Sequence, residues 1–371
     1  MYNNKTMSGT KNGRLKSLDA LRGFDMLLLV GVGAVLRALP NLWDTPISVA
    51  LANQVRHTEW QGFHLWDLIF PLFIFIVGVS MPFSISNRLE RGGDRKRLYV
   101  AIVRRTVILF SLGLVMNGWL AFDFSDLKWT GVLQRISIAY FFTAIIVMNS
   151  QVRGQAITAV LLLVVYWLLM ILVPVPGYGA GVLTPEGNLH AYIDQLLLPG
   201  RMYNDFYDED GILQQLSSIA VCLAGVVAGQ WLRLPKTENT KVIGLLTSGL
   251  VCIIIALIWS ISFPIIFKLW SSSFAMLTIG VSSVLLGLFY WIIDVKGYQK
   301  WAFPFIVVGL NSITIYLASG LFDFGSVVNV FVHGFIDYLG SFKPLFWALC
   351  MLTAKWLLVY FFYKKNIFLK V

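Results

Sequence analysis

Charged residues are scarce in this 371-residue chain, since Asp, Glu, Lys and Arg together make up only 13% of it, about half of their share in soluble domains. Hydrophobic residues make up 57%, and the mean hydropathy is +0.74. This composition argues against a soluble domain and predicts a polytopic membrane protein. The net charge of +10 is therefore expected to reflect basic loops beside a membrane, and no nucleic-acid partner is expected.

Cysteine is also rare, and the three cysteines (Cys222, Cys252 and Cys350) lie inside apolar runs without paired spacing. This argues against a disulfide framework and against a metal site. The sequence contains no Gly-rich phosphate loop, HExxH, CxxC or GxSxG motif, which removes the common catalytic designs of soluble enzymes. We find no internal repeat and no low-complexity segment.

Apolar runs long enough to cross a bilayer, about 20 residues each, recur along the whole chain. They predict an all-α membrane protein with about ten transmembrane helices in one bundle and one domain over residues 1–371. The spans are expected at roughly 20–39, 64–86, 100–121, 131–149, 155–173, 211–232, 241–260, 271–293, 301–320 and 344–363. Residues 321–343 are interpreted as an interfacial or re-entrant element, and no cleaved signal peptide is expected.

Basic residues predict the sidedness. With these spans, 21 of the 29 Lys and Arg residues fall on the side of the N-terminus, including residues 1–17 and the C-terminal tail. Positive charge marks the cytoplasmic side, so both termini are predicted to be cytoplasmic. The loops 40–63, 174–210, 261–270 and 321–343 are predicted to lie outside.

The stretch before the second span carries two histidines and two acids within eleven residues. His57 is a natural group to accept a proton from an ammonium or a hydroxyl, and Asp67 in the first turn of the helix could hold its tautomer. The alternative is a loop histidine and a helix-capping acid that never meet. Glu59 and His64 are rivals for the same roles.

Three further polar positions have two interpretations each. Arg22, in the run Ser17–Asp25, could bind a phosphate or join a buried ion-pair cluster, although positive-inside anchoring and helix capping explain this run equally well. Gln134 and Arg135 could reach sugar hydroxyls or an anion, although an arginine there could also extend to the interface. Asn311, near the middle of a span, could line a polar cavity or make an interhelical hydrogen bond.

Several motifs occur together in an order that resembles the heparan-α-glucosaminide N-acetyltransferase family over nearly the whole chain. They are Ser17-Leu18-Asp19 with Arg22-Gly23, His57-x-x-Trp60-x-Gly62, Asp67-Leu68-x-Phe70-Pro71, Gly131-Val132-Leu133-Gln134-Arg135, Ala191-Tyr192-Ile193-Asp194, Asp210-Gly211-Ile212-Leu213 and Asn311-Ser312. Motifs in one fixed order are more specific than any single one. The Leu18-Asp19-x-x-Arg22-Gly23 opening alone is shared by wider membrane acyltransferases.

The resemblance implies an enzyme that moves acetyl from cytoplasmic acetyl-CoA to the amine of a glucosamine-type sugar on the periplasmic side. His57 would be the general base or an acetyl carrier, supported by Asp67. It implies substrate binding by Trp60, Gln134, Arg135 and Asp194, CoA binding by Arg22, Arg104, Arg105 and Asn311, and no metal. The expected location is the bacterial inner membrane, where lipid surrounds the chain. The resemblance is also compatible with a homodimer.

One departure from the resemblance concerns the pocket, because the lysosomal members carry an Asn eleven residues beyond the Arg-Gly arginine and this chain has Gly33. Two other functions stay open at this stage. One is a transporter or flippase for an amino sugar or glycan, which usually shows inverted repeats. The other is an O-acetyltransferase that acts on a periplasmic polysaccharide.

Overall fold

The computed structural model describes residues 15–90 and 92–369, and all regular secondary structure in that part is helical. Strand-like pairing within it is limited to two isolated bridges, Gln61 with Ile266 and Val175 with Gly179. The all-α prediction is therefore confirmed. Most of the basic N-terminal segment assigned to the cytoplasm, residues 1–14, lies outside the described residues.

Nine helical segments of the described chain are long and apolar enough to cross a membrane. They are α1, η1 and α2 (Lys16–Leu27, Leu28–Val32, Gly33–Leu42); α4, η2 and α5 (Leu65–Met81, Pro82–Ser86, Asn87–Glu90); α6 (Arg95–Met116); α7 (Val132–Asn149); α8 (Val152–Leu172); α10 (Gln215–Arg233); α11 (Glu238–Trp259); α12 and η5 (Ser272–Phe289, Tyr290–Val295); and η6 and α16 (Ile336–Phe342, Lys343–Lys364). The chain is a multi-pass membrane protein.

A tenth span is broken. Helices α13 (Phe303–Leu310) and α14 (Ser312–Leu321) meet at Asn311 with a bend of 73°. With this pair counted as one span, the predicted ten spans are confirmed, but the break was not anticipated. Residues 321–343, expected to be interfacial or re-entrant, form the short helix α15 (Phe324–Val332) and the 3-10 segment η6.

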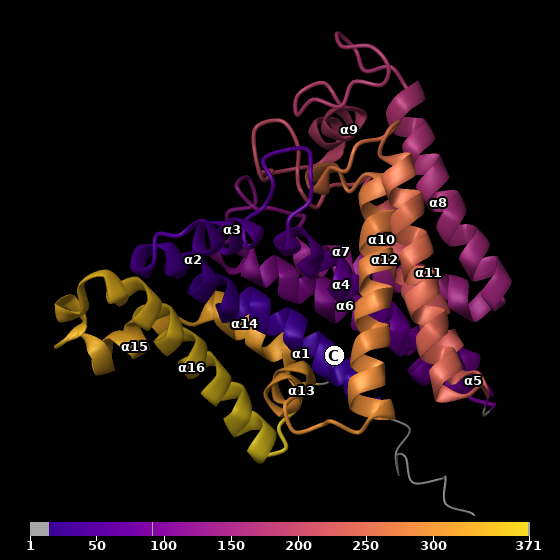
Figure 1. Ribbon diagram of the computed structural model, residues 1–371. Helices are drawn as coiled ribbons and strands as arrows, with labels where there is room; N and C mark the ends of the chain where they lie inside the picture. Colours follow the sequence, from indigo (N-terminus) through magenta and orange to yellow (C-terminus); the bar gives the residue numbers. More distant parts are fainter. Residues whose placement is uncertain (1–14, 91, 370–371) are drawn as a thin grey trace, which may run out of the picture.

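The remaining helices are short. They are α3 (Pro46–Gln54), η3 (Trp119–Ala121), α9 (Leu189–Leu197) and η4 (Phe267–Leu269). All but Trp119–Ala121, which falls within the span predicted at 100–121, lie in the loops predicted to be outside. In Figure 1, α9 lies at the top, whereas α5, α13 and the end of α16 lie toward the bottom. The ends predicted to be cytoplasmic thus lie opposite α9, as the predicted topology requires.

Helices α4 and α10 form the centre of the bundle and touch backbone to backbone. A Cβ added at Gly78 would lie 1.9 Å from the Cys222 carbonyl oxygen, and one at Gly225 would lie 2.1 Å from the Phe75 oxygen. Small residues permit such close contact between membrane helices, where dispersion replaces the hydrophobic effect as the main attraction. These glycines therefore fix α4, which carries Asp67 in its first turn, directly against α10.

Helices α1 and α13 make a similar contact. A Cβ on Gly23 would lie 1.7 Å from the Phe305 oxygen, and one on Gly309 would lie 1.9 Å from the Asp19 oxygen. Lys16 at the start of α1 donates to Gln299, just before α13, and the Phe24 ring further along α1 packs 5.8 Å from that of Phe305 in α13, so the two helices run in the same direction. A residue that lies a given number of positions after Gly23 is therefore at about the same level along the bundle as the residue the same number of positions after Gly309.

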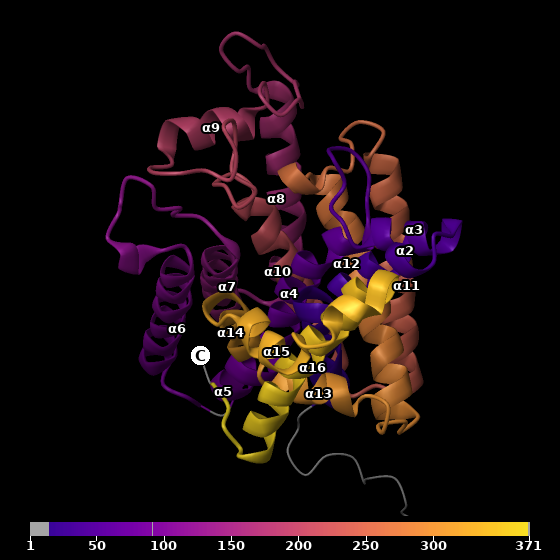
Figure 2. The same ribbon diagram turned by 90° about the vertical axis from the view of Figure 1, so that its left-hand side faces the viewer.

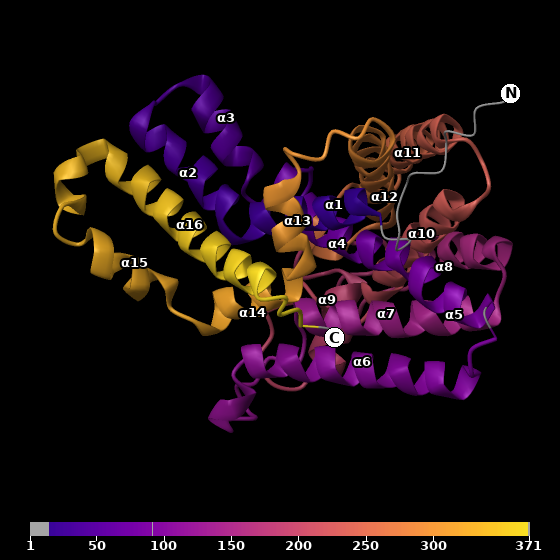
Figure 3. The same cartoon turned by 90° about the horizontal axis from the view of Figure 1, so that it is seen from below.

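Helices α2, α3, α15 and α16 form a lobe at one side of the bundle, seen from below in Figure 3. Its own small core consists of Val328, Val332 and Ile336, packed against side chains of α16 that include Trp347. Figure 2 shows α14 and α16 in front of the central helices, beside α6 and α7. The pocket described next lies where α1, α4, α7 and α14 meet.

Candidate active site

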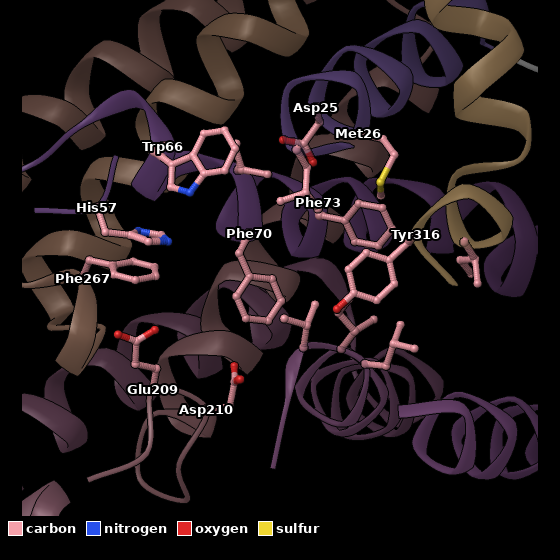
Figure 4. Close-up of a pocket in the computed structure, with 16 residues that line it drawn as sticks. Asp25, Met26, His57, Trp66, Phe70, Phe73, Glu209, Asp210, Phe267 and Tyr316 are labelled. Atoms are coloured by element: carbon pink, nitrogen blue, oxygen red, sulfur yellow. The ribbon is translucent and has the colours of Figure 1, made fainter. Parts of the chain in front are cut away.

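A pocket of about 940 Å³, including its open mouth, lies between four helices and the outer loops. Its walls are mostly apolar, and the labelled lining residues in Figure 4 are Asp25, Met26, His57, Trp66, Phe70, Phe73, Glu209, Asp210, Phe267 and Tyr316. Figure 4 shows His57, Phe267 and Glu209 at one end and Met26, Phe73 and Tyr316 at the other. A mostly apolar cavity with a few convergent polar groups is the usual form of a small-molecule site.

His57 and Asp67 meet at the end of the pocket beside Phe267 and Glu209. His57 Nδ1 lies 2.7 Å from Asp67 Oδ1, and the Asp67 side chain is fully buried. Asp67 also accepts hydrogen bonds from the His64 backbone N–H (2.9 Å) and the Thr58 hydroxyl (3.4 Å). Asp67 is therefore both the capping acid of α4 and the partner of His57, so the two sequence interpretations do not exclude each other.

The loop that carries His57 is held in place by a second loop. Gly62 adopts φ +120°, a conformation open to glycine, and its N–H donates to the Ile265 oxygen (2.9 Å). This places the Phe267 ring against the His57 imidazole, with centroids 4.4 Å apart and planes within 10°. With Nδ1–H donated to Asp67, the Nε2 atom of His57 is the one left to act as a base.

The two rivals of His57 do not line the pocket. His64 Nδ1 lies 2.9 Å from the Arg56 carbonyl oxygen, and Glu59 is exposed on the loop. His57 is itself 39% exposed at its side chain and lines the pocket. Of these three side chains only His57 lines the pocket, and its catalytic role stays a prediction.

Glu209 and Asp210 line the pocket beside His57, and sequence reasoning did not single them out as site residues. Burial raises the pKa of Glu209, with the nearby His57 acting in the opposite direction. Burial also raises the pKa of Asp210, opposed by Arg135 and Lys128. The run Tyr207-Asp208-Glu209-Asp210-Gly211 was a visible acidic signal, but its spacing gives no link to His57.

Arg135 lies outside the pocket lining, fully buried under the loop that carries the acids. Its guanidinium donates to Ser218 Oγ (2.6 Å), Gln214 Oε1 (2.8 Å) and the Glu209 carbonyl oxygen (2.9 Å). It lies 3.7 Å from the centroid of the Trp270 ring and 3.6 Å from Asp210 Oδ1. The side chain does not extend to the membrane interface. It positions Glu209 and Asp210 at the pocket.

The other residues assigned to substrate binding also lie off the pocket lining. Trp60 donates to the Leu183 oxygen (2.9 Å) and packs against Tyr207. Asp194 accepts from the backbones of Asp208 and Ile212, and burial raises its pKa. Gln134 is buried beside Gly113 and Gly131. These contacts hold the outer loops, and a direct contact with substrate stays a prediction.

Comparison with known proteins adds to this geometry. Residues 14–180 match a domain family of unknown function, DUF5009. Heparan-alpha-glucosaminide N-acetyltransferase of Homo sapiens is 28% identical over 421 aligned positions, covering 96% of this chain and 60% of that protein. The same enzyme of Mus musculus is 26% identical over 442 positions, covering 100% of this chain and 62% of that protein. The chain is a distant homologue of these acetyltransferases.

The resemblance predicted from the motifs is thereby confirmed. The chain spans about three fifths of the length of these N-acetyltransferases. Within residues 15–90 and 92–369, no group of three His, Cys, Asp or Glu side chains could hold a metal ion, and the expectation of a metal-free site stays a prediction.

Gly33, the departure from the lysosomal N-acetyltransferases, lies against the pocket wall. A Cβ added there would lie 2.3 Å from the Trp66 ring, and Trp66 lines the pocket with its ring 6.4 Å from that of His57. An Asn at this position would need the indole to move. In this N-acetyltransferase homologue, Trp66 therefore shapes the pocket wall beside Gly33, the position at which the resemblance implies an Asn.

The arginines assigned to CoA lie toward the opposite end of the bundle from His57. Arg22 donates to Ser80 Oγ (2.8 Å). Arg104 and Arg105 line a second pocket, together with Ser84, Arg88 and Tyr140, and Arg105 lies 4.5 Å from the centroid of the Tyr140 ring. Three arginines, Arg88, Arg104 and Arg105, thus line this second pocket, which we call the arginine pocket.

Arg22 lies between the two pockets. Ser80 and Ser84 are one turn apart in the span that begins with α4, and Ser84 lines the arginine pocket. On α7, Ile136 lines the first pocket and Tyr140, one turn away, lines the second. The two pockets therefore lie one after the other along α7 and the span that begins with α4.

Proposed function

We propose that this protein transfers acetyl from cytoplasmic acetyl-CoA to the amine of a glucosamine-type sugar on the periplasmic side of the bacterial inner membrane. The observation that carries the proposal is the 2.7 Å contact between His57 and the buried Asp67 at the outer end of a pocket between the helices. Distant homology to membrane N-acetyltransferases supports it.

In this reaction His57 Nε2 takes a proton from the sugar ammonium, because an amine attacks a carbonyl only in its neutral form. The amine nitrogen then bonds to the thioester carbon, the carbon–sulfur bond breaks, and the nitrogen loses its second proton to solvent to give the neutral amide. The CoA thiolate leaves with a proton returned by His57. Asp67 stabilises the imidazolium between the two steps. A route through an acetyl-His57 intermediate uses the same groups.

The donor would reach His57 from the arginine pocket. From Asp67, the partner of His57, to Ser84 the second span rises roughly 25 Å at 1.5 Å per residue, so the donor must lie extended along this span for its thioester to reach His57. Arginines suit the phosphates of CoA because a guanidinium binds a phosphate in bidentate fashion. The three arginines around Ser84 would hold the nucleotide end while the thioester lies beside His57.

Glu209 would receive the acceptor's ammonium beside His57. Since burial raises the pKa of Glu209, its carboxyl keeps a proton to higher pH than a free glutamate. A protonated carboxyl binds an ammonium poorly, so we expect the KM for the amine to fall as pH rises through this raised pKa. Glu209→Gln should raise that KM about tenfold and remove this part of the pH profile, with kcat less affected. An unchanged profile would exclude Glu209 from acceptor binding.

The proposed function is tested with purified protein in proteoliposomes. Acetyl-CoA is supplied on one side only, glucosamine, its oligosaccharides or muropeptides on the other, and products are identified by mass spectrometry. We expect N-acetylated sugar across the membrane from the donor. Sugar that crosses unchanged without acetyl-CoA would indicate a transporter, and ester products would indicate an O-acetyltransferase. Either result would overturn the proposal.

A further inference from the structure

Asp25 has no role in the reaction described above, yet it lines the same pocket. It lies on α1, is 1% exposed, and neither of its carboxylate oxygens has a hydrogen-bond partner among the described residues. A buried polar group without a partner is costly in protein and more so within a membrane. Such a group in a pocket indicates a ligand that supplies the missing hydrogen bond.

The surroundings of Asp25 limit the kind of ligand. In Figure 4, Asp25 has the apolar side chains of Met26 and Phe73 on one side and the Trp66 indole on the other, and all three line the pocket. A sugar ring carries several hydroxyl groups, and each would need a partner when buried. This part of the pocket instead suits an extended, mostly apolar chain with an isolated polar group.

A second unpartnered side chain lies at the same depth. Gly23 of α1 touches Gly309 of α13, and two residues further along these parallel helices come Asp25 and Asn311. Neither the amide nitrogen nor the amide oxygen of Asn311 has a partner among the described residues. The span breaks at this residue, and irregular backbone at membrane depth is tolerated where it lines a cavity.

The position of Asp25 also matches the donor's path. In Figure 4 it lies between Trp66, near His57, and Met26, and Arg22 comes one turn earlier on the same helix. A thioester arm that runs from the arginine pocket to His57 would pass it. The arm of CoA contains two amides, each with one donor and one acceptor, separated by methylene groups.

We propose that Asp25 is a positioning residue that hydrogen-bonds an amide of the acyl donor's arm inside the membrane. The inference rests on the proposed function for the identity of the donor. Asp25 does not touch the reacting atoms. It fixes the arm so that the thioester reaches His57, while Glu209 and Asp210 are left for the acceptor.

The test compares Asp25→Leu, Asp25→Asn and Ser282→Ala with the wild type. Ser282 is also buried and unpartnered but lies on α12 away from the pocket, so it controls for loss of a buried polar group. Binding of CoA is measured by calorimetry. We expect about fivefold to tenfold weaker binding for Asp25→Leu, as for one lost hydrogen bond, and near wild-type binding for Asp25→Asn and Ser282→Ala.

A second measurement identifies the amide. The ratio of kcat/KM between wild type and Asp25→Leu is determined with acetyl-CoA and with an S-acetyl alkanethiol that contains no amide. We expect Asp25→Leu to lower kcat/KM with acetyl-CoA and to leave it almost unchanged with the alkanethiol, because the effect requires both the Asp25 carboxylate and an amide in the donor. Unchanged CoA binding in Asp25→Leu would overturn the proposal, as would a raised KM for the amine alone, which would assign Asp25 to the acceptor.

The failure of this inference is distinguishable from that of the proposed function. A wild-type protein that binds CoA but acetylates no amine would refute the proposed function, and the binding comparison would still decide the role of Asp25. A wild-type protein that does not bind CoA would refute both.

Discussion

Replacing His57 with Ala should lower kcat for acetyl transfer by about 10²–10⁴-fold, the usual contribution of a positioned general base. Binding of CoA should stay within about twofold, since His57 lies at the opposite end of the pocket from Met26 and Phe73. Asp67→Asn should also lower kcat, because its amide no longer fixes the tautomer of His57. Steady-state rates and calorimetric CoA binding on the purified variants measure both effects.

The matched control is His64→Ala. This neighbouring imidazole contacts the Arg56 carbonyl oxygen and does not line the pocket, so its loss should leave the rate near wild type. Equal losses in both histidine variants would indicate damage to the loop instead of a lost base. An acetylated His57 peptide trapped with acetyl-CoA alone would select the two-step route over direct attack.

Arg135→Met should destabilise the fold by about 3–5 kcal/mol, the cost of breaking a buried ion pair. The substitution removes hydrogen bonds to Ser218, Gln214 and the Glu209 carbonyl and leaves Asp210 with the more distant Lys128. Methionine keeps contact with the Trp270 ring, so the loss is mainly electrostatic. We expect the apparent melting temperature to fall by roughly 5–10 °C, measured in one detergent for all variants.

Arg201→Met is the control for Arg135→Met. Arg201 lies 3.8 Å from Asp126, and both side chains are more than half exposed, so this pair should contribute less than about 1 kcal/mol. A normal melting temperature for Arg135→Met with a raised KM for the amine would contradict the positioning role. It would favour the direct substrate contact that the sequence motif suggested.

The number of spans, the helical class and the His57–Asp67 pair could be predicted because each depends on short-range sequence. Apolar runs set the spans, and Asp67 lies in the first turn of α4, only ten residues after His57. A glycine turn at Gly62 is enough to bring the two together. Local patterns of this kind carry most of the information needed.

Glu209 and Asp25 could not be predicted, since each reaches the pocket through contacts distant in sequence. Glu209 lies beside His57 because Arg135 of α7 holds the carbonyl of its loop. Asp25 faces the cavity because α1 packs against α13, almost three hundred residues later. Arg135 was identified as important, but its motif alone does not distinguish a substrate contact from a buried structural one.

The glycine contact between α4 and α10 restricts how the protein can move. Since no side chain separates Gly78 from the Cys222 carbonyl or Gly225 from the Phe75 carbonyl, the two helices cannot slide or rotate against each other without a steric clash. Asp67 and Gln214, at the outer ends of this unit, keep a constant separation through a turnover. A movement that admits a substrate is therefore expected at the opposite wall, where α14 follows the 73° bend at Asn311.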